Sequence, residues 1–262
     1  MKVVIKVGTS TLAYATGRLN IRHVEELVKT LSDLKNAGHE VILVSSGAIG
    51  MGVGKLNLAS RPTDMPTKQA AAAVGQCELM YTYDRLFSQY NHTVAQLLLT
   101  GEDIDHQDRR HNFENTVRRL LELGVLPIVN ENDTVATAEI SVGDNDTLGA
   151  VVACSAGADL LVMLSDIEGL YTADPRRYPG AALIPVVEEI TPEIEALAGQ
   201  AGSALATGGM ATKLKAAQMA TGRGCDVVIA NGARPELLYD IVAGRPAGTR
   251  FLSRRNGVEG GN

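Results

Sequence analysis

Carboxylate and amide side chains are concentrated in one short stretch of the chain, residues 130–146. An apolar run at 125–129 precedes this stretch, and a helical pattern of small residues at 147–156 follows it. Acids and amides between a buried strand and a helix start are typical of a ligand pocket at the carboxyl end of a strand. The alternative is a solvated acidic loop built from turn-forming Asn and Asp residues. The chemically active side chains of the stretch are Asn130, Glu131, Asn132, Asp133, Glu139, Asp144, Asn145 and Asp146.

Lys6 is a second candidate, because it lies inside the apolar run 2–7, which ends at a Gly-Thr-Ser turn. A lysine in a central strand is costly unless its ammonium reaches a charge at the end of the strand. The pattern therefore favours a phosphate partner for Lys6. The alternative is an edge strand that leaves this lysine in water.

Glycines recur between Gly47 and Gly54 and are followed by Lys55, which suggests a phosphate loop at first sight. Their spacing matches neither of the two common nucleotide-binding glycine motifs. We expect these glycines to let a ligand or a second backbone approach closely.

The hydrophobic pattern predicts strands that alternate with helices along the chain. The expected strands are 2–7, 40–44, 93–99, 125–129, 160–164, 183–187, 226–230 and 248–252. The expected helices are 21–36, 68–90 with an interruption at Gly75, 108–123 with an Asp cap, 147–156, a short helix opened by Thr191 and Pro192, 210–221 and 236–243. Residues 199–209 are small and glycine-rich, and we expect a mobile loop there.

This alternation predicts the α/β class, with a doubly wound, mostly parallel sheet and helices on both faces. Such sheets bind ligands at the carboxyl ends of their strands. Polar groups fall at four predicted strand ends, namely Lys6 with Gly8, Ser46 with Gly47, residues 130–133, and Ser165 with Asp166. Parallel strands bring these groups to one edge of the sheet, which favours a binding site there.

The composition narrows the class of protein. The 262 residues suffice for one large domain or two small ones. A net charge of −6 and the absence of Trp disfavour a nucleic-acid-binding protein. The three cysteines, Cys77, Cys154 and Cys225, are widely spaced, which predicts reduced, buried thiols in a cytoplasmic protein. A redox or nucleophilic role is disfavoured, since no basic residue flanks them.

The sequence indicates neither a membrane span nor a metal site made of protein residues. The apolar run 2–7 is too short for a signal peptide or a transmembrane helix. The five histidines show no metal-binding spacing. We therefore expect no association with a membrane and no metal ligands from the protein.

Several motifs together carry a resemblance that covers nearly the whole chain. They are V-I-K-V-G-T-S (4–10), V-S-S-G-A-I (44–49), A-A-V-G-Q (72–76), V-N-E-N-D-T-V-A-T (129–137), V-G-D-N-D (142–146), L-S-D-I-E-G-L-Y-T-A-D-P-R (164–176) and A-T-G-G-M-A-T-K (206–213). The chain resembles the amino-acid-kinase family, and within it the bacterial glutamate 5-kinases. The first two motifs are shared with sister kinases, and the N-E-N-D and G-D-N-D pair points to glutamate.

The resemblance implies ATP-dependent phosphorylation of the side-chain carboxylate of L-glutamate. The products are L-glutamyl 5-phosphate and ADP, and the reaction is the first step of proline biosynthesis. A glutamate carboxylate, with an ordinary pKa of about 4.3, is already ionised at neutral pH, so the nucleophile needs no general base. The obstacle is repulsion between two anions, so catalysis should consist of positioning and charge neutralisation. Mg²⁺ is expected to arrive with ATP, held mostly by phosphates and water.

The resemblance also assigns roles to residues. Lys6 and Lys213 would stabilise the transferring phosphoryl group, and Asp146 would orient both lysines. The resemblance marks Ser46, Asp133 and Asn145 most clearly as substrate contacts. By their chemistry, Asp133 and Asp144 are suited to accept from the ammonium of glutamate. Ser46, Asn130 and Asn145 can hydrogen-bond its carboxylates without adding repulsion. The implied nucleotide contacts are Lys6, Gly8, Ser165, Asp166, Thr207, Gly208, Gly209, Met210, Ala211, Thr212 and Lys213, and residues 171–176 would line the adenine and ribose side.

The remaining expectations concern domains and partners. The kinase domain should span 1–252, with a flexible tail at 253–262 and without the PUA domain that most family members carry. The resemblance implies a homo-oligomer in the cytoplasm, feedback inhibition by proline, and a glutamyl-phosphate reductase as the downstream enzyme.

Two alternatives remain open. The acceptor could be aspartate, N-acetylglutamate, carbamate or UMP, although a blocked amine would leave two pocket aspartates without their cation. A non-catalytic amino-acid or nucleotide sensor should have lost a phosphate-binding lysine or the orienting aspartate. Lys6, Asp146 and Lys213 are all present, which favours an enzyme.

Overall fold

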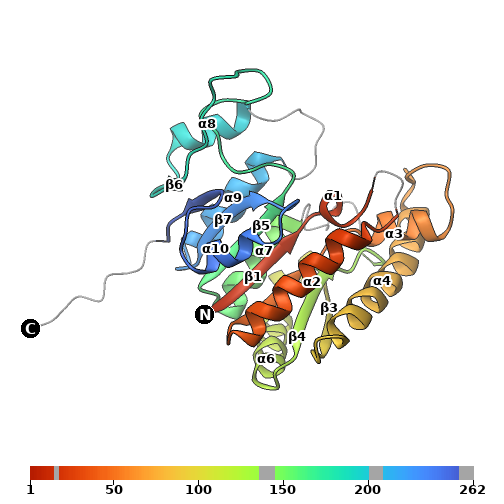
Figure 1. The fold of residues 1–262 in the computed structure, drawn as a ribbon. Coiled ribbons are helices and arrows are strands. Elements are labelled where there is room, and N and C mark those ends of the chain that lie inside the picture. Colours follow the sequence, from red (N-terminus) through yellow and green to blue (C-terminus); the bar gives the residue numbers. More distant parts are fainter. Residues whose placement is uncertain (15–17, 136–144, 201–208, 254–262) are drawn as a thin grey trace, which may run out of the picture.

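The computed structural model describes residues 1–14, 18–135, 145–200 and 209–253. Their eight strands form one sheet in the order β3-β4-β2-β1-β5-β7-β8-β6 (Figure 1). The strands are β1 (Lys2–Val7), β2 (Glu40–Val44), β3 (Val94–Leu99), β4 (Leu126–Glu131), β5 (Leu160–Ser165), β6 (Val186–Val187), β7 (Asp226–Asn231) and β8 (Thr249–Phe251). In this spatial order, all neighbouring pairs among β3, β4, β2, β1, β5 and β7 are parallel. Strand β8 is antiparallel to β7 and parallel to β6. The predicted fold class is therefore confirmed.

Helices cover both faces of the sheet and give a three-layer molecule. The helices are α1 (Thr9–Leu12), α2 (Ile21–Asn36), α3 (Ala48–Lys55), α4 (Met65–Ser88), α5 (Gly101–Asp105), α6 (Gln107–Glu122), α7 (Asn145–Ala156), α8 (Pro192–Gln200), α9 (Met210–Thr221) and α10 (Leu237–Val242). Residues of α2, α4 and α10 form the hydrophobic core on one face of the sheet. Residues of α6, α7 and α9 form the core on the other.

The alternation of side chains along β1 decides which face receives Lys6. Val3 and Ile5 belong to the core beneath α2, and Val4 belongs to the core beneath α7 and α9. Because side chains alternate along a strand, Lys6 shares the face of Val4. The sequence thus places this lysine against α7 and α9, which supply its partners.

Strands β1 and β5 are hydrogen-bonded neighbours at the centre of the sheet. The chain leaves β1 towards β2 on one side and leaves β5 towards β7 on the other. Adjacent strands whose connections diverge leave a crevice at their carboxyl ends, where ligands of such folds bind. Lys6 and Ser165 lie at this point.

Two glycines allow helices α3 and α4 to pack in backbone contact. A Cβ added at Gly52 would lie 1.8 Å from the carbonyl oxygen of Ala71, and one added at Gly75 would lie 1.7 Å from that of Ala48. The expected close approach of a second backbone is therefore found. The expected interruption at Gly75 is wrong, because α4 runs continuously through it.

Other sequence expectations need correction. Strand β4 continues to Glu131, two residues beyond the predicted end, because Asn130 and Glu131 still pair with β3. His106, not an aspartate, occupies the cap position of α6. Cys77 is exposed rather than buried.

The expected mobile loop, 199–209, lies outside the described residues at 201–208. Of the expected tail, Ser253 donates hydrogen bonds to Asp226, and residues 254–262 lie outside the described residues.

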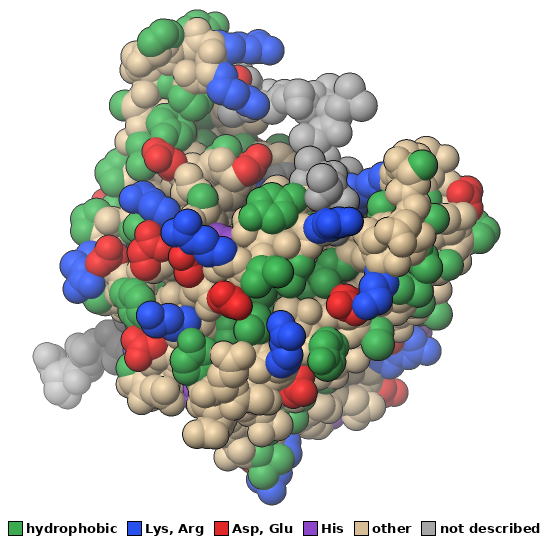
Figure 2. All heavy atoms as spheres, turned by 45° about the vertical axis from the view of Figure 1, so that its right-hand side comes forward, with side chains coloured by type: hydrophobic (Ala, Val, Ile, Leu, Met, Phe, Trp, Pro, Cys, Tyr) green, Lys and Arg blue, Asp and Glu red, His purple; other side chains and the backbone are tan. Residues whose placement is uncertain are grey.

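Acidic and basic side chains are interspersed on the face seen in Figure 2. A nucleic-acid-binding surface would instead gather Lys and Arg on one face. The face seen in Figure 2 therefore does not show a continuous basic surface. Within the described residues, no helix is long and apolar enough to cross a membrane.

Candidate active site

Asp146 lies between two lysines that come from distant parts of the chain. Its Oδ1 is 2.7 Å from Nζ of Lys6, and its Oδ2 is 2.9 Å from Nζ of Lys213. Asp146 is fully buried, and the lysines are only 7% and 4% exposed. Two ammonium groups and one carboxylate leave a buried cluster with a net charge of +1. Such a charge is costly without an anion, so the cluster is suited to bind a phosphate.

Opposing effects act on the pKa of Asp146. Burial by itself would raise the pKa, but the ammonium groups of Lys6 and Lys213 outweigh burial and lower it. The carboxylate is therefore ionised at neutral pH and holds both lysines. Thr212 adds a third contact, with its hydroxyl donating to Oδ2 of Asp146 over 3.3 Å.

Helices α7 and α9 position these groups. Gly149 in α7 lets the helix approach β1, because a Cβ added there would lie only 3.3 Å from Cβ of Lys6. Helix α9 begins at Met210 after Gly209, which provides no side-chain cap. The first backbone N–H groups of a helix and its dipole favour an anion. Lys213 is therefore placed one turn inside a helix whose start is suited to phosphate.

Two of the residues expected to contact the nucleotide, Gly8 and Ser165, lie at the carboxyl ends of the paired strands β1 and β5. Gly8 follows β1, and a Cβ added to it would lie 3.8 Å from Nζ of Lys6. Ser165 is buried at the end of β5 and donates to the exposed Asp166 over 3.1 Å. Thr207 and Gly208 lie outside the described residues.

The segment 171–176, expected near the adenine, makes contacts of its own. The hydroxyl of Tyr171 donates to Glu168 over 2.7 Å. Asp174 accepts hydrogen bonds from the backbone and the side chain of Arg176. A nucleotide contact for this segment stays a prediction.

A network of amides lies at the neighbouring strand ends. Asn130 in β4 donates to Oε1 of Gln76 over 2.8 Å. Asn145 donates through Nδ2 to the hydroxyl oxygen of Ser46 and to the carbonyl oxygen of Ser45, the latter over 3.0 Å. Ser46, Asn130 and Asn145, which were expected to bind one substrate, are therefore brought together.

Gln76 was missed as a site residue, although it ends the A-A-V-G-Q motif. Its position on a long helix gave no sign that it would reach the strand ends. The glycine contact between α3 and α4 brings it there.

Asp133 follows β4 and is half-buried. Burial and the neighbouring Glu131 raise its pKa to about 6, although Arg61 acts in the opposite direction. An ammonium group near Asp133 would relieve this penalty, so the carboxylate is suited to a cationic ligand group. Asp144, its expected companion, lies outside the described residues.

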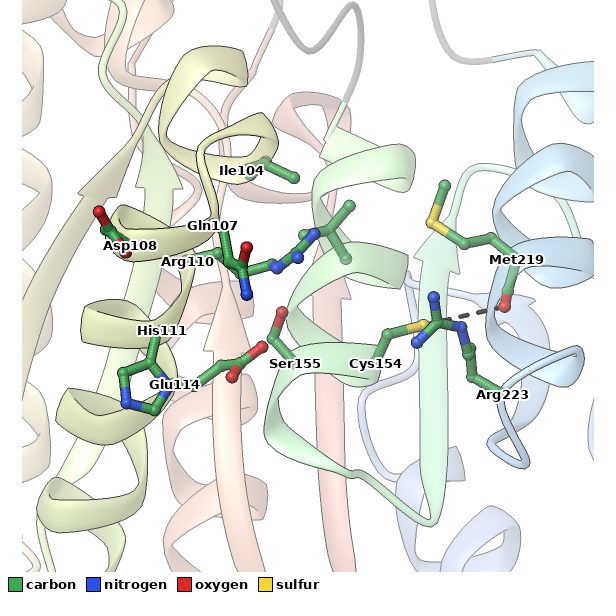
Figure 3. Close-up of a pocket in the computed structure, with 11 residues that line it drawn as sticks. Ile104, Gln107, Asp108, Arg110, His111, Glu114, Cys154, Ser155, Met219 and Arg223 are labelled. Atoms are coloured by element: carbon green, nitrogen blue, oxygen red, sulfur yellow. Dashed lines mark hydrogen bonds between the residues drawn. The ribbon is translucent and has the colours of Figure 1, made fainter.

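A hollow of about 720 Å³ lies away from these groups, between α6 and the neighbouring helices α7 and α9 (Figure 3). Arg110 and Glu114 of α6 face Ser155 of α7 across it, and Arg223 approaches from the other side. None of the predicted site residues lines this hollow. It is therefore distinct from the lysine cluster.

No built metal site is found in the part of the chain that the structure describes, where no three His, Cys, Asp or Glu side chains are grouped for a metal ion. Both oxygens of Asp146 already face lysines. This donor set fits a divalent ion that is held mainly by nucleotide phosphates and water.

Comparisons with known proteins identify the family of this chain. The model of the amino acid kinase family matches residues 1–231. The chain belongs to the amino acid kinase family. It is 55% identical over 249 residues to a glutamate 5-kinase of Clostridium tetani, covering 95% of this chain and 93% of that protein. It is 54% identical over 255 residues to a glutamate 5-kinase of Moorella thermoacetica, covering 97% of this chain and 68% of that protein.

A solved structure supports the fold alone. Carbamate kinase from Giardia lamblia bound to AMP-PNP superposes with a TM-score of 0.70 at 17% identity, covering 96% of this chain and 98% of that one.

Proposed function

We propose that the protein transfers the γ-phosphate of ATP to the side-chain carboxylate of L-glutamate, giving L-glutamyl 5-phosphate and ADP in the first step of proline biosynthesis. The observation that carries the proposal is the buried cluster of Lys6, Asp146 and Lys213, with its net charge of +1. The glutamate 5-kinases, with about half of their residues identical over nearly the whole chain, support the choice of acceptor.

The chemistry follows from the charges. A carboxylate oxygen of glutamate attacks the γ-phosphorus, the bond from that phosphorus to the bridging oxygen breaks, and ADP leaves with the electron pair. Lys6 and Lys213 neutralise the phosphoryl oxygens, while Asp146 keeps the two ammonium groups apart and oriented. The acceptor is ionised from the start, so no side chain has to remove a proton. A divalent ion, Mg²⁺ in this proposal, supplies further neutralisation when it is bound with ATP.

The two ends of the acceptor need different groups. Asp133 and Asp144 accept from the ammonium of glutamate, and Ser46, Asn130 and Asn145 recognise its carboxylates. The lysines come from other elements, Lys6 from the carboxyl end of β1 and Lys213 from the first turn of α9. Gly8, Ser165, Asp166 and residues 207–213 hold the nucleotide.

The proposal extends to regulation and partners. Proline would compete with glutamate for the same amide pocket. The acyl phosphate product is a reactive mixed anhydride, so a reductase has to consume it promptly. We place the protein in the cytoplasm as a homo-oligomer whose chain, within 1–252, forms one kinase domain.

Trapping of the acyl phosphate tests the proposal directly. Hydroxylamine attacks the acyl carbon, displaces phosphate and leaves a stable hydroxamate. We expect hydroxamate that depends on ATP and glutamate and decreases when proline is added. Aspartate, N-acetylglutamate and carbamate are tested in parallel, and ADP release is measured with UMP. Turnover with one of these acceptors and none with glutamate would refute the proposal.

A further inference from the structure

Gln76 reaches the substrate side of the sheet from the middle of helix α4. It is buried, and its Oε1 accepts a hydrogen bond of 2.8 Å from Nδ2 of Asn130. The contact of the neighbouring Gly75 with Ala48 fixes α4 against the start of α3, just after Ser46. Gln76 is thereby held in a defined position relative to the pocket.

The bonds around Asn130 permit only one orientation of its amide. Its Oδ1 accepts from the backbone N–H of Glu131 over 2.9 Å and from Nδ2 of Asn145 over 3.4 Å. Rotating the amide by half a turn would direct an NH₂ group against both donors. Nδ2 of Asn130 must therefore point to Gln76, whose oxygen supplies its acceptor.

The orientation of Asn130 in turn constrains Asn145. With Nδ2 directed to Asn130, Ser45 and Ser46, the amide of Asn145 uses its donor side within the protein. Ser46 acts as an acceptor in this bond, and among the described residues it donates to no other group. Its O–H is therefore available to donate to a carboxylate of the substrate.

We propose that Gln76 is a positioning residue for the acceptor: through Asn130 it fixes the Asn145 and Ser46 pair in the orientation that offers the Ser46 hydroxyl to a carboxylate. This inference rests on the proposed function. Gln76 itself contacts no reacting atom in this account. Its effect should therefore appear in acceptor binding and not in ATP binding.

Gln76→Met tests the inference, since it retains the length of the side chain but removes the acceptor for Asn130. Loss of a buried hydrogen bond with its partner left unpaired predicts an increase of about tenfold in KM for glutamate. KM for ATP and kcat should stay close to the wild-type values. Gln76→Asn is one methylene shorter and remains polar, and it replaces the Met variant if that variant folds poorly. It should likewise raise KM for glutamate while KM for ATP and kcat stay close to the wild-type values.

Thr82→Val is the matched control, because Thr82 is buried in the same helix and its hydroxyl donates to the carbonyl oxygen of Glu78, one turn earlier in that helix. It should leave both KM values unchanged. A double-mutant cycle with Asn130→Leu adds a second criterion. If Gln76 acts through Asn130, Gln76→Met should have no further effect on KM for glutamate in the Asn130→Leu background.

Three outcomes would overturn the inference. They are equal increases in both KM values, multiplicative effects in the double variant, or a lower midpoint of thermal unfolding with unchanged KM for glutamate. The wild-type hydroxamate assay separates these outcomes from failure of the proposed function. If the wild type uses another acceptor, the same comparison is made with that acceptor.

Discussion

The ammonium of Lys6 lies 2.7 Å from a carboxylate oxygen of Asp146, although the two residues are separated by more than half of the chain. Lys6 comes from the central strand β1, and Asp146 comes from the first turn of α7. A lysine in a buried strand and a fully buried aspartate are each costly without a counter-charge. Together with Lys213 they form a buried cluster of two ammonium groups and one carboxylate.

Asp146→Asn should affect both stability and catalysis. The substitution removes the charge with which Asp146 pairs both buried ammonium groups, and breaking a buried ion pair typically costs about 3–5 kcal/mol. Misplacement of both lysines should lower kcat by about a hundredfold or more. Urea unfolding and steady-state kinetics measure the two effects.

Asp240→Asn is the control for this variant, because Asp240 pairs with Arg245 at the surface. An exposed pair is typically worth less than about 1 kcal/mol. Equal losses of stability in the two variants would contradict the special role of Asp146.

Lys213→Ala should lower kcat by about a hundredfold or more, as expected for loss of one preorganised charge at the transferring group. KM for glutamate should change little, because the proposed mechanism assigns Lys213 to the phosphoryl group and not to the amide pocket. Lys215→Ala, on the exposed side of the same helix, should keep wild-type kinetics. Wild-type turnover in Lys213→Ala would show that this lysine does not stabilise the transferring phosphoryl group.

Glutamate binding should depend on pH through Asp133, whose pKa is raised to about 6. Below this pH the carboxyl group is protonated and cannot pair with the substrate ammonium, so KM for glutamate should rise as the pH falls from 7.5 to 5.5. KM for ATP should not follow the same curve. Asp133→Asn should raise KM for glutamate far more than KM for ATP and should abolish the difference between the two pH values.

The raised pKa of Asp133 also predicts that the free energy of unfolding decreases as the pH rises, whereas glutamate binding improves. The pKa of Asp133 in the folded protein lies above its ordinary value of 3.8, so the folded state takes up a proton between these values. Its contribution to stability is complete below about pH 4 and is lost as the pH rises through 6. Without ligand at pH 8, Asp133→Asn should therefore be more stable than the wild type, by about 1–2 kcal/mol after allowance for solvent screening. A less stable variant at pH 8 would contradict the raised pKa.

Gly75→Ala should destabilise the protein by at least about 3 kcal/mol, at the upper end of overpacking effects. The added methyl would lie 1.7 Å from the carbonyl oxygen of Ala48, so α3 and α4 must separate. Gly180→Ala is the control, because no atom lies within 4 Å of its added Cβ. Similar unfolding midpoints for both variants and the wild type would show that the helices separate without cost.

Much of the fold follows from local patterns. Helices α2 and α9 and strand β2 begin and end where the periodicity of apolar residues predicts. The boundaries were less predictable where tertiary contacts decide them. Strand β4 extends over Asn130 and Glu131 because β3 offers it partners, and their polar side chains concealed this extension. Gly75 lies in a continuous helix because close packing, and not local flexibility, requires a glycine there.

The sequence by itself determined the class of chemistry. Lysines and an aspartate within recognisable motifs, at predicted strand and helix ends, are properties of the chain that require no coordinates. Tertiary structure alone decided the pairings: Asp146 between Lys6 and Lys213, and Gln76 against Asn130. The physical reason is that strand alternation and helix packing determine which side chains share a face, whereas contact between distant segments depends on sheet order and on glycines that let helices approach.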